Sequence, residues 1–394
     1  MILPGIGLRL AEAGRGRLVA KLFYFVFYAA IGSLAPFFNV YLQQAGLNGQ
    51  QIGLLSGVLP LVALVSSPFW GALADRWQIH RQVLAFCAFA SGGISLLFLP
   101  LSGFWALVGL VVLLSFFRTP IPAIVDASVM DLVKQTGSSY GRQRLWGSLG
   151  FVLFSFGIGR LLVLDNLVPI FWLHGLLLGI GCGLLGLLLP IERRENPTGL
   201  WEGLGVMTRR PGFASFLAAL VLAGVALSGY TNFLSLHMME LGGTSGQVGL
   251  AWALAAILEI PMMALGAAWM SRFSQRRLIL TSFGGFAAVW TVMGLATTPT
   301  AVLLAIPFAG ASYAIFWMAV VGYAAEVAPP GMGATAQALI GAAQAGLGWA
   351  IGSVLAGALW DIYGGMGVYL TIAGVMMLAA AVFGWGSDKR AIFV

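Results

Sequence analysis

The stretch that decides the fold runs from residue 51 to residue 81 and reads QIGLLSGVLPLVALVSSPFWGALADRWQIHR. A related stretch, QVGLAWALAAILEIPMMALGAAWMSRFSQRR, occupies residues 247–277. One ungapped shift of 196 positions (247 − 51) aligns the Gln-x-Gly-Leu starts, the apolar runs and the two exit arginines. This repeat favours a duplicated membrane bundle, which is how many transporters are built. A chance resemblance between two apolar helices is the alternative.

The composition identifies the membrane as the solvent of this chain. Only 8% of the residues are charged, 60% are hydrophobic, and the mean hydropathy is +0.95. A soluble domain has about 25% charged residues, so this chain lacks a water-facing surface. Cys87 and Cys182 lie inside apolar runs, and no disulfide framework, metal site or cofactor is expected.

The apolar runs predict twelve membrane helices in two halves of six, the all-α arrangement of a duplicated bundle, because about twenty apolar residues cross the hydrocarbon. We expect an amino-terminal bundle over 1–190, a cytoplasmic linker over 191–210 and a carboxy-terminal bundle over 211–394. The expected spans are 18–43, 50–74, 82–100, 104–130, 141–163, 168–190, 211–239, 245–270, 278–297, 300–326, 334–357 and 364–386.

The basic residues set the expected orientation. With the amino terminus inside, 17 of the 20 Lys and Arg fall in cytoplasmic segments, as the positive-inside rule requires. Both termini are then cytoplasmic, and the first residues form a basic tail rather than a cleavable signal. The net charge of +7 is explained by anchoring to an anionic inner leaflet, so no nucleic-acid partner is expected.

Four ionisable residues inside the spans are the candidate functional groups: Arg118, Asp126, Arg144 and Glu259. Each costs at least about 2.5–3.5 kcal/mol to insert, so each requires a reason. Asp126 and Arg144 lie at the inner ends of successive antiparallel helices and are expected to meet. Arg118 precedes Asp126 by eight residues, about 12 Å of helical rise. An ion pair that only locks two helices together is the structural alternative.

Glu259 is the candidate proton carrier. No Lys or Arg is expected at a similar depth in the second half. A carboxyl that is exposed to water on the two sides of the membrane alternately, and buried in between, would take up and release a proton. A carboxyl kept neutral by a hydrogen bond to a neighbour is the alternative.

The segment Gly71-Ala-Leu-Ala-Asp75-Arg76, with Arg81 five residues later, resembles the signature loop of the major facilitator superfamily. Gln78 stands where that signature usually has glycine. The resemblance implies a cytoplasmic latch formed by the aspartate and arginines. Its echo in the second half is the pair Arg272 and Arg277.

A narrower resemblance covers essentially the whole chain. PAIVD ending at Asp126, YGRQRLWGS around Arg144 and AILE ending at Glu259 are similar to the branch that contains lactose permease and the phenylpropionate permease. The resemblance implies that Asp126 and Arg144 contact substrate. Phe151 stands where lactose permease stacks a tryptophan on its sugar, and Trp317 stands near a family histidine. The second half therefore lacks most of that permease's charged relay.

Together these observations predict a monomeric transporter in the bacterial inner membrane, with a central cavity lined by Asp126, Arg144, Arg118, Phe151 and Trp317. We expect proton-driven uptake of a small organic solute, since a guanidinium favours carboxylates or hydroxyls. An exporter of the same fold is the nearest alternative. A membrane enzyme is disfavoured because the three histidines are scattered. A non-transporting sensor or a lipid scramblase is the third alternative.

Overall fold

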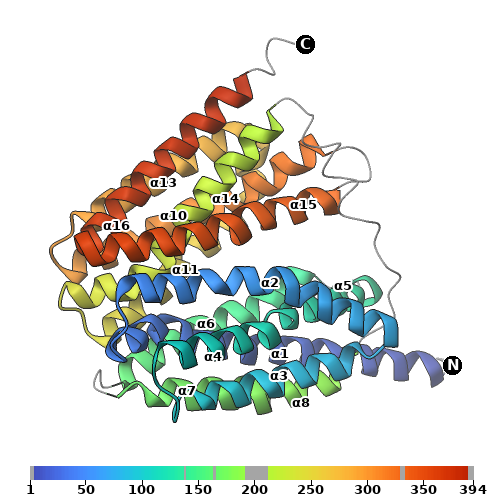
Figure 1. Cartoon of the computed structure of the whole chain (residues 1–394). Coiled ribbons are helices and arrows are strands. Elements are labelled where there is room, and N and C mark those ends of the chain that lie inside the picture. The colour runs from blue at the N-terminus through green and yellow to red at the C-terminus, as the bar shows by residue number, and fades with distance from the viewer. Residues whose placement is uncertain (1–3, 137–138, 163–165, 191–211, 329–332, 389–394) are drawn as a thin grey trace. The chain divides into compact units, whose positions relative to one another are not determined.

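The computed structural model of the chain describes residues 4–136, 139–162, 166–190, 212–328 and 333–388, and every regular element in these ranges is a helix (Figure 1). The expected linker 191–210 lies outside them. By its internal contacts the chain forms two units, 1–41 with 62–196 and 42–61 with 197–394. The beginning of α2 therefore clusters with the second unit.

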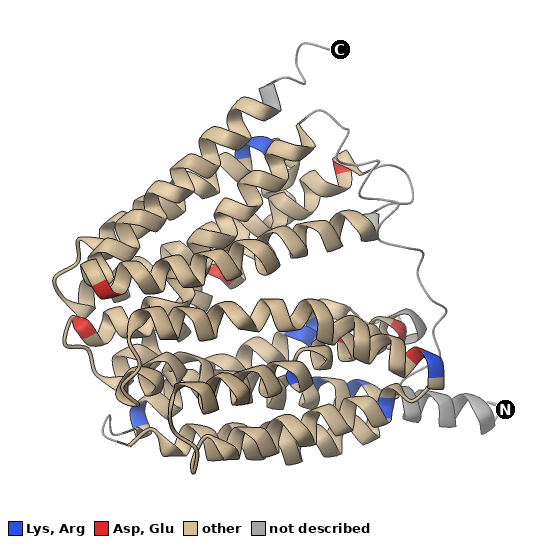
Figure 2. Ribbon diagram, viewed as in Figure 1, with Lys and Arg blue, Asp and Glu red and all other residues tan. Residues whose placement is uncertain are grey.

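Nine helical stretches in the described part of the chain are long and apolar enough to cross a membrane. The last of them, Thr335–Gly386, contains a break at Gly364 and therefore holds two spans. Helices α3 and α6 have 18 and 22 residues and complete the expected twelve. Charged residues are sparse along these helices (Figure 2), which is consistent with burial in lipid.

The first unit contains the end of α2 and most of the amino-terminal helices. Its core joins aromatic residues such as Phe23, Phe27 and Trp70 to aliphatic residues from the neighbouring helices. Proline at position 120 begins α5 and separates it from α4. The elements are α1 (Pro4–Gln44), α2 (Gly49–Trp77), α3 (His80–Leu97), α4 (Phe104–Arg118), α5 (Pro120–Thr136), α6 (Tyr140–Leu161), α7 (Val168–Gly175), the π-helical η1 (Leu176–Cys182) and α8 (Gly183–Leu188).

In the second unit, α10 packs along α16, and α14 packs against both α11 and α13. Phe216, Phe283, Phe286 and Trp290 are almost fully buried between these helices. The elements are α10 (Phe213–Glu240), α11 (Ser245–Ala264), α12 (Gly266–Arg272), α13 (Gln275–Gly294), α14 (Pro299–Val327), α15 (Gly333–Gly341), the π-helical η2 (Ala342–Gly348) and α16 (Trp349–Asp388).

The internal repeat extends to the way two helices begin. At α2 the amide of Gln51 donates to Asn48 Oδ1 (2.9 Å), and the amide of Asn48 donates to Gln51 Oε1 (3.1 Å). At α11 the amide of Thr244 donates to Gln247 Oε1 (2.9 Å), and the amide of Gln247 donates to Thr244 Oγ1 (3.2 Å). Both pairs form the reciprocal capping box that satisfies orphan amides. The two capping boxes are separated by the same 196 positions (244 − 48 and 247 − 51), so the repeat is present in the structure as well as in the sequence.

The start of α2 is fixed to α16 by a carboxylate and by glycines. Asp361 accepts hydrogen bonds from the amides of Gly49 (2.6 Å) and Gln50 (2.9 Å). A Cβ at Gly53 would meet the backbone carbonyl of Ser353. Small residues are therefore needed here because the two helix backbones approach closely.

Candidate functional site

The centre of the candidate site in the first unit is a hydrogen bond between α1 and α5. The hydroxyl of Tyr24 donates to Asp126 Oδ1 at 2.6 Å. The Tyr24 side chain is almost fully buried, and its ring meets that of Tyr140 edge to face, with centroids 6.5 Å apart. A short bond to a charged acceptor in apolar surroundings is strong, so Asp126 is held in place by a phenol rather than by a base.

The guanidinium of Arg144, on α6, lies over an aromatic ring of α1. Its Cζ is 3.8 Å from the centroid of Tyr28 and 5.8 Å from that of Tyr24. This distance is typical of a cation–π contact, which is stronger when water is excluded. Gly147 makes room for the contact, since a Cβ there would lie 2.6 Å from the Tyr28 ring and 2.7 Å from Arg144 Nη1.

The expected ion pair between Asp126 and Arg144 does not form in the described part of the chain. Tyr28 lies within electrostatic range of both charges. Each charge is instead satisfied by a tyrosine of α1: Asp126 by a hydroxyl and Arg144 by a ring face. The prediction of a direct pair was wrong because it compared only the two charged helices and ignored the polar aromatic residues of a third.

Arg118 ends α4 and lies near a buried histidine. His174, on α7, is fully buried, and its Nδ1 is 2.7 Å from the hydroxyl of Ser95. Arg118 is close enough to His174 for an electrostatic interaction. The two aromatic candidates occupy different units. Phe151 is half-buried on α6, and Trp317, on α14, stacks on Tyr313 with centroids 6.5 Å apart.

Glu259, on α11, lies within electrostatic range of two tyrosines of the second unit. Its carboxyl interacts electrostatically with Tyr230 and Tyr313. The Tyr230 ring stacks on Trp290 with centroids 5.7 Å apart. Sequence reasoning missed the tyrosines at both sites. The available signal was a polar aromatic residue within an apolar run, repeated one turn apart at Tyr24 and Tyr28.

The residues of the expected latch lie at helix ends. Asp75 Oδ1 is 2.8 Å from His80 Nε2, and this partner was not anticipated. Gly71 faces open space, so nothing in the first unit crowds it. The four arginines of the latch all have exposed side chains, namely Arg76, Arg81, Arg272 and Arg277. Arg276, beside the last of them, instead donates from Nη2 to the carbonyl of Gly384 at 3.1 Å.

A family model described as "MFS_1 like family" matches residues 18–371. The chain belongs to the MFS_1-like family. This membership confirms the resemblance to the major facilitator superfamily and the all-helical fold that it implies. Its members among the relatives below are membrane transporters, so the chain is an integral membrane transporter and not an enzyme.

Two bacterial relatives are similar over nearly the whole chain. The "Maltose permease" of Geobacillus stearothermophilus is 30% identical over 374 residues, which cover 93% of this chain and 94% of the relative. The "Probable 3-phenylpropionic acid transporter" of Escherichia coli is 29% identical over 374 residues, which cover 90% and 94%. Among solved structures, the nucleoside transporter NupG has a TM-score of 0.85 at 16% identity, covering 96% of this chain and all of that chain (100%). This last similarity concerns the fold alone.

Proposed function

We propose that this MFS_1-like chain takes up a small organic solute by alternating access and couples the uptake to protons. The observation that carries the proposal is the cluster of Tyr24, Tyr28, Asp126 and Arg144 in the first unit. It offers a planar guanidinium, a carboxylate and aromatic faces within an apolar bundle. Charged groups are expensive at such a place, so a role in holding a polar solute is the best reason for them.

Two solute classes fit this chemistry. A guanidinium binds a carboxylate or adjacent hydroxyls through its fork of donors, and a ring face packs on a sugar or an aryl group. The names of the two relatives that match over nearly the whole chain point to the same solute classes, a disaccharide and an aromatic acid. Arg118, within electrostatic range of His174, and half-buried Phe151 are proposed as further solute contacts of the first unit. Trp317, stacked on Tyr313, is proposed as a solute contact of the second unit.

Glu259 is the proposed proton carrier. It is a carboxyl on a membrane helix with the phenols of Tyr230 and Tyr313 within electrostatic range. Phenols can donate to the charged carboxylate and accept from the neutral acid, so the same surroundings suit both protonation states. This arrangement supports proton uptake and release at one site.

Binding is tested by thermal unfolding of the purified protein with maltose, 3-phenylpropionate and uridine as three separate probes. A bound solute raises the unfolding temperature by mass action. We expect one probe to stabilise the wild type and Arg160→Ala but not Arg144→Ala. Arg160 is the matched control because it also lies over a ring, that of Phe156 at 5.1 Å, on an exposed part of α6. If the probe stabilised Arg144→Ala as much as the wild type, the solute would not bind at this cluster.

Export is the second candidate direction. The "Multidrug resistance protein MdtG" of Salmonella typhi is 26% identical over 270 residues, 63% of this chain and 66% of the relative. In energised inside-out vesicles, export fills the vesicles with the probe and uptake does not. The sign of the accumulation therefore separates the two candidates.

We further propose a monomer in a bacterial inner membrane with cytoplasmic termini and a cytoplasmic latch formed by the exposed arginines. Both native cysteines are buried, so a labelling reagent is expected to react only with introduced thiols. Exposed Ser271, beside Arg272, and exposed Ser102, between α3 and α4, are suitable positions. An impermeant maleimide added to intact cells should label Ser102→Cys and not Ser271→Cys. The reverse labelling would invert the topology.

A further inference from the structure

His237 and Glu240 form a polar pair near the end of α10. The His237 side chain is only 2% exposed and the Glu240 side chain is 40% exposed. Nδ1 of His237 lies 3.1 Å from Glu240 Oε2, and Nε2 lies 2.9 Å from the backbone carbonyl of Met293. The imidazole therefore joins α10 to α13 while it contacts the carboxyl on its own helix.

Both ring nitrogens of His237 face groups that act as acceptors. A backbone carbonyl cannot donate, and an ionised carboxylate cannot donate either. A neutral imidazole carries one N–H, so it can satisfy only one of the two contacts. The observed geometry is satisfied when the pair holds one additional proton, either on the imidazole or on the carboxyl. A buried contact between two lone pairs would otherwise cost free energy.

The break in α16 is shaped around this pair. Gly365 donates its amide to Glu240 Oε2 at 2.9 Å. Gly364 has a φ of 61°, a left-handed conformation that glycine adopts without strain. A Cβ at Gly364 would meet the Glu240 carboxylate, and a Cβ at Gly365 would meet both that carboxylate and the His237 ring. The two glycines let the backbone of α16 close on the carboxyl.

The neighbouring titratable groups do not replace the missing donor. Tyr369, on α16, stacks on the His237 ring with centroids 4.8 Å apart, and its hydroxyl lies 3.5 Å from the carbonyl of Tyr230. Asp361, also on α16, accepts from the amides at the start of α2. The group of α13 that contacts His237 is the backbone carbonyl of Met293, and Tyr363, on α16, is 66% exposed. Glu240 is therefore the charged group in direct contact with His237.

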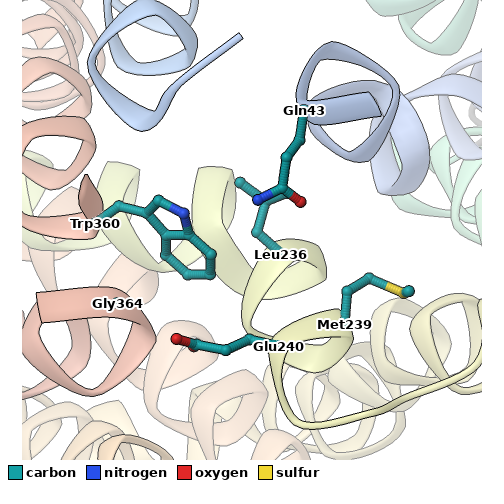
Figure 3. Close-up of a pocket in the computed structure, with 6 residues that line it drawn as sticks. All are labelled: Gln43, Leu236, Met239, Glu240, Trp360 and Gly364. Atoms are coloured by element: carbon teal, nitrogen blue, oxygen red, sulfur yellow. The ribbon is translucent and has the colours of Figure 1, made fainter. Parts of the chain in front are cut away.

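A pocket in the second unit is lined in part by Glu240. It has a volume of about 380 Å³ and is lined by Gln43, Leu236, Met239, Glu240, Trp360 and Gly364. Figure 3 shows the Glu240 carboxyl directed into it, toward Gly364 and the ring of Trp360. Water in this pocket gives protons a path to the carboxyl, while the imidazole behind it stays buried.

We propose that His237 and Glu240 form a proton-binding site, separate from Glu259, that holds one proton and fastens α10 to α13 and α16. Loss of that proton at alkaline pH leaves a lone pair of His237 against the carboxylate. This end of the second unit then loosens. This site is separate from the proposed transport groups, and neither of the two measurements that test it depends on transport.

The first test compares the pH dependence of thermal unfolding in the wild type and Glu240→Gln. A carboxamide is neutral and does not stabilise an additional proton on the imidazole, so the variant lacks the shared proton. Between pH 6 and pH 9 we expect the unfolding temperature of the wild type to fall by roughly 3 °C more than that of the variant. Glu326→Gln, an exposed carboxyl on α14, is the matched control and should follow the wild type. Parallel profiles for wild type and Glu240→Gln overturn the proposal.

The second test needs only the wild-type protein. Amide hydrogen exchange, corrected for the intrinsic effect of pH, reports the local opening of a segment. Protection in a peptide spanning 361–369 should fall between pH 6 and pH 9, because Gly365 donates to Glu240. Protection in the first half of α10, at residues 216–226, should stay constant. Unchanged protection over 361–369 contradicts the proposal.

Discussion

The hydroxyl of Tyr24 donates a 2.6 Å hydrogen bond to the carboxylate of Asp126. This contact couples α1 to α5 at the point where Arg144 of α6 stacks on the neighbouring Tyr28. The two opposite charges of the first unit are thus held by tyrosines and not by each other. In the proposed function, the tyrosines position both charges to contact the solute.

Tyr24→Phe removes the hydroxyl and leaves the ring in the core. Asp126 then loses the hydrogen bond that it accepts from the phenol, and a bond to a charged acceptor is worth about 1.5–3 kcal/mol. We expect the affinity for the identified solute to fall by about tenfold or more, with a small change in the unfolding temperature. Binding titration by calorimetry measures the first quantity. An unchanged affinity together with a lowered unfolding temperature would make the contact purely structural.

Arg144→Lys keeps the charge and removes the planar fork. An ammonium does not stack on Tyr28 as a guanidinium does, and it cannot bind a carboxylate or a pair of hydroxyls with two parallel bonds. We expect the initial rate of probe uptake to fall at least tenfold. Arg160→Lys makes the same change at another ring-stacked arginine and should retain the wild-type rate. Equal losses in the two variants would assign the effect to general packing.

Gly53→Val inserts a branched side chain where α2 meets the backbone of α16. The first carbon would meet the carbonyl of Ser353, so the helices must separate. Overpacking of this kind costs about 1–3 kcal/mol, and thermal unfolding should register the loss. Gly109→Val, on α4, is the control because no atom lies within 4 Å of a Cβ built there. Comparable stability of the two variants would mean that α2 and α16 do not pack as described.

Asp361→Ala removes the carboxylate that caps α2. Two amide hydrogen bonds and the interaction of the charge with the helix amino terminus are lost together. We expect a loss of about 0.5–2 kcal/mol in unfolding free energy. Urea-induced unfolding in detergent measures the difference, with Glu326→Ala as the exposed-carboxyl control. No difference between the variants would show that the cap does not contribute.

The sequence was most informative where a single helix decides the outcome. The 196-residue repeat predicted two related halves, and the structure repeats it as matched caps at Gln51 and Gln247. Apolar length predicted the spans, because the hydrocarbon thickness sets them. These features depend on local sequence, so one chain without any alignment was sufficient.

The contacts of the candidate site depend on three helices at once, and here sequence reasoning was incomplete. Asp126 and Arg144 were identified as important, but their partners on α1 are 102 and 116 positions earlier (126 − 24 and 144 − 28). Tyrosine in an apolar run is common and carries no charge, so the one-turn repeat of Tyr24 and Tyr28 is only a weak signal. His237 and Glu240 are three positions apart on one helix, but their contacts with Met293 of α13 and Gly365 of α16 are long-range and were missed for a similar reason.

Proton-driven accumulation in proteoliposomes tests the central claim most directly. Proteoliposomes that contain the wild type and are supplied with the binding probe should concentrate it inside when an inward proton gradient is imposed. A protonophore should abolish the accumulation. Glu259→Gln should still exchange the probe across the membrane but should not accumulate it, since a carboxamide cannot carry a proton. Accumulation by Glu259→Gln equal to that of the wild type would contradict the account.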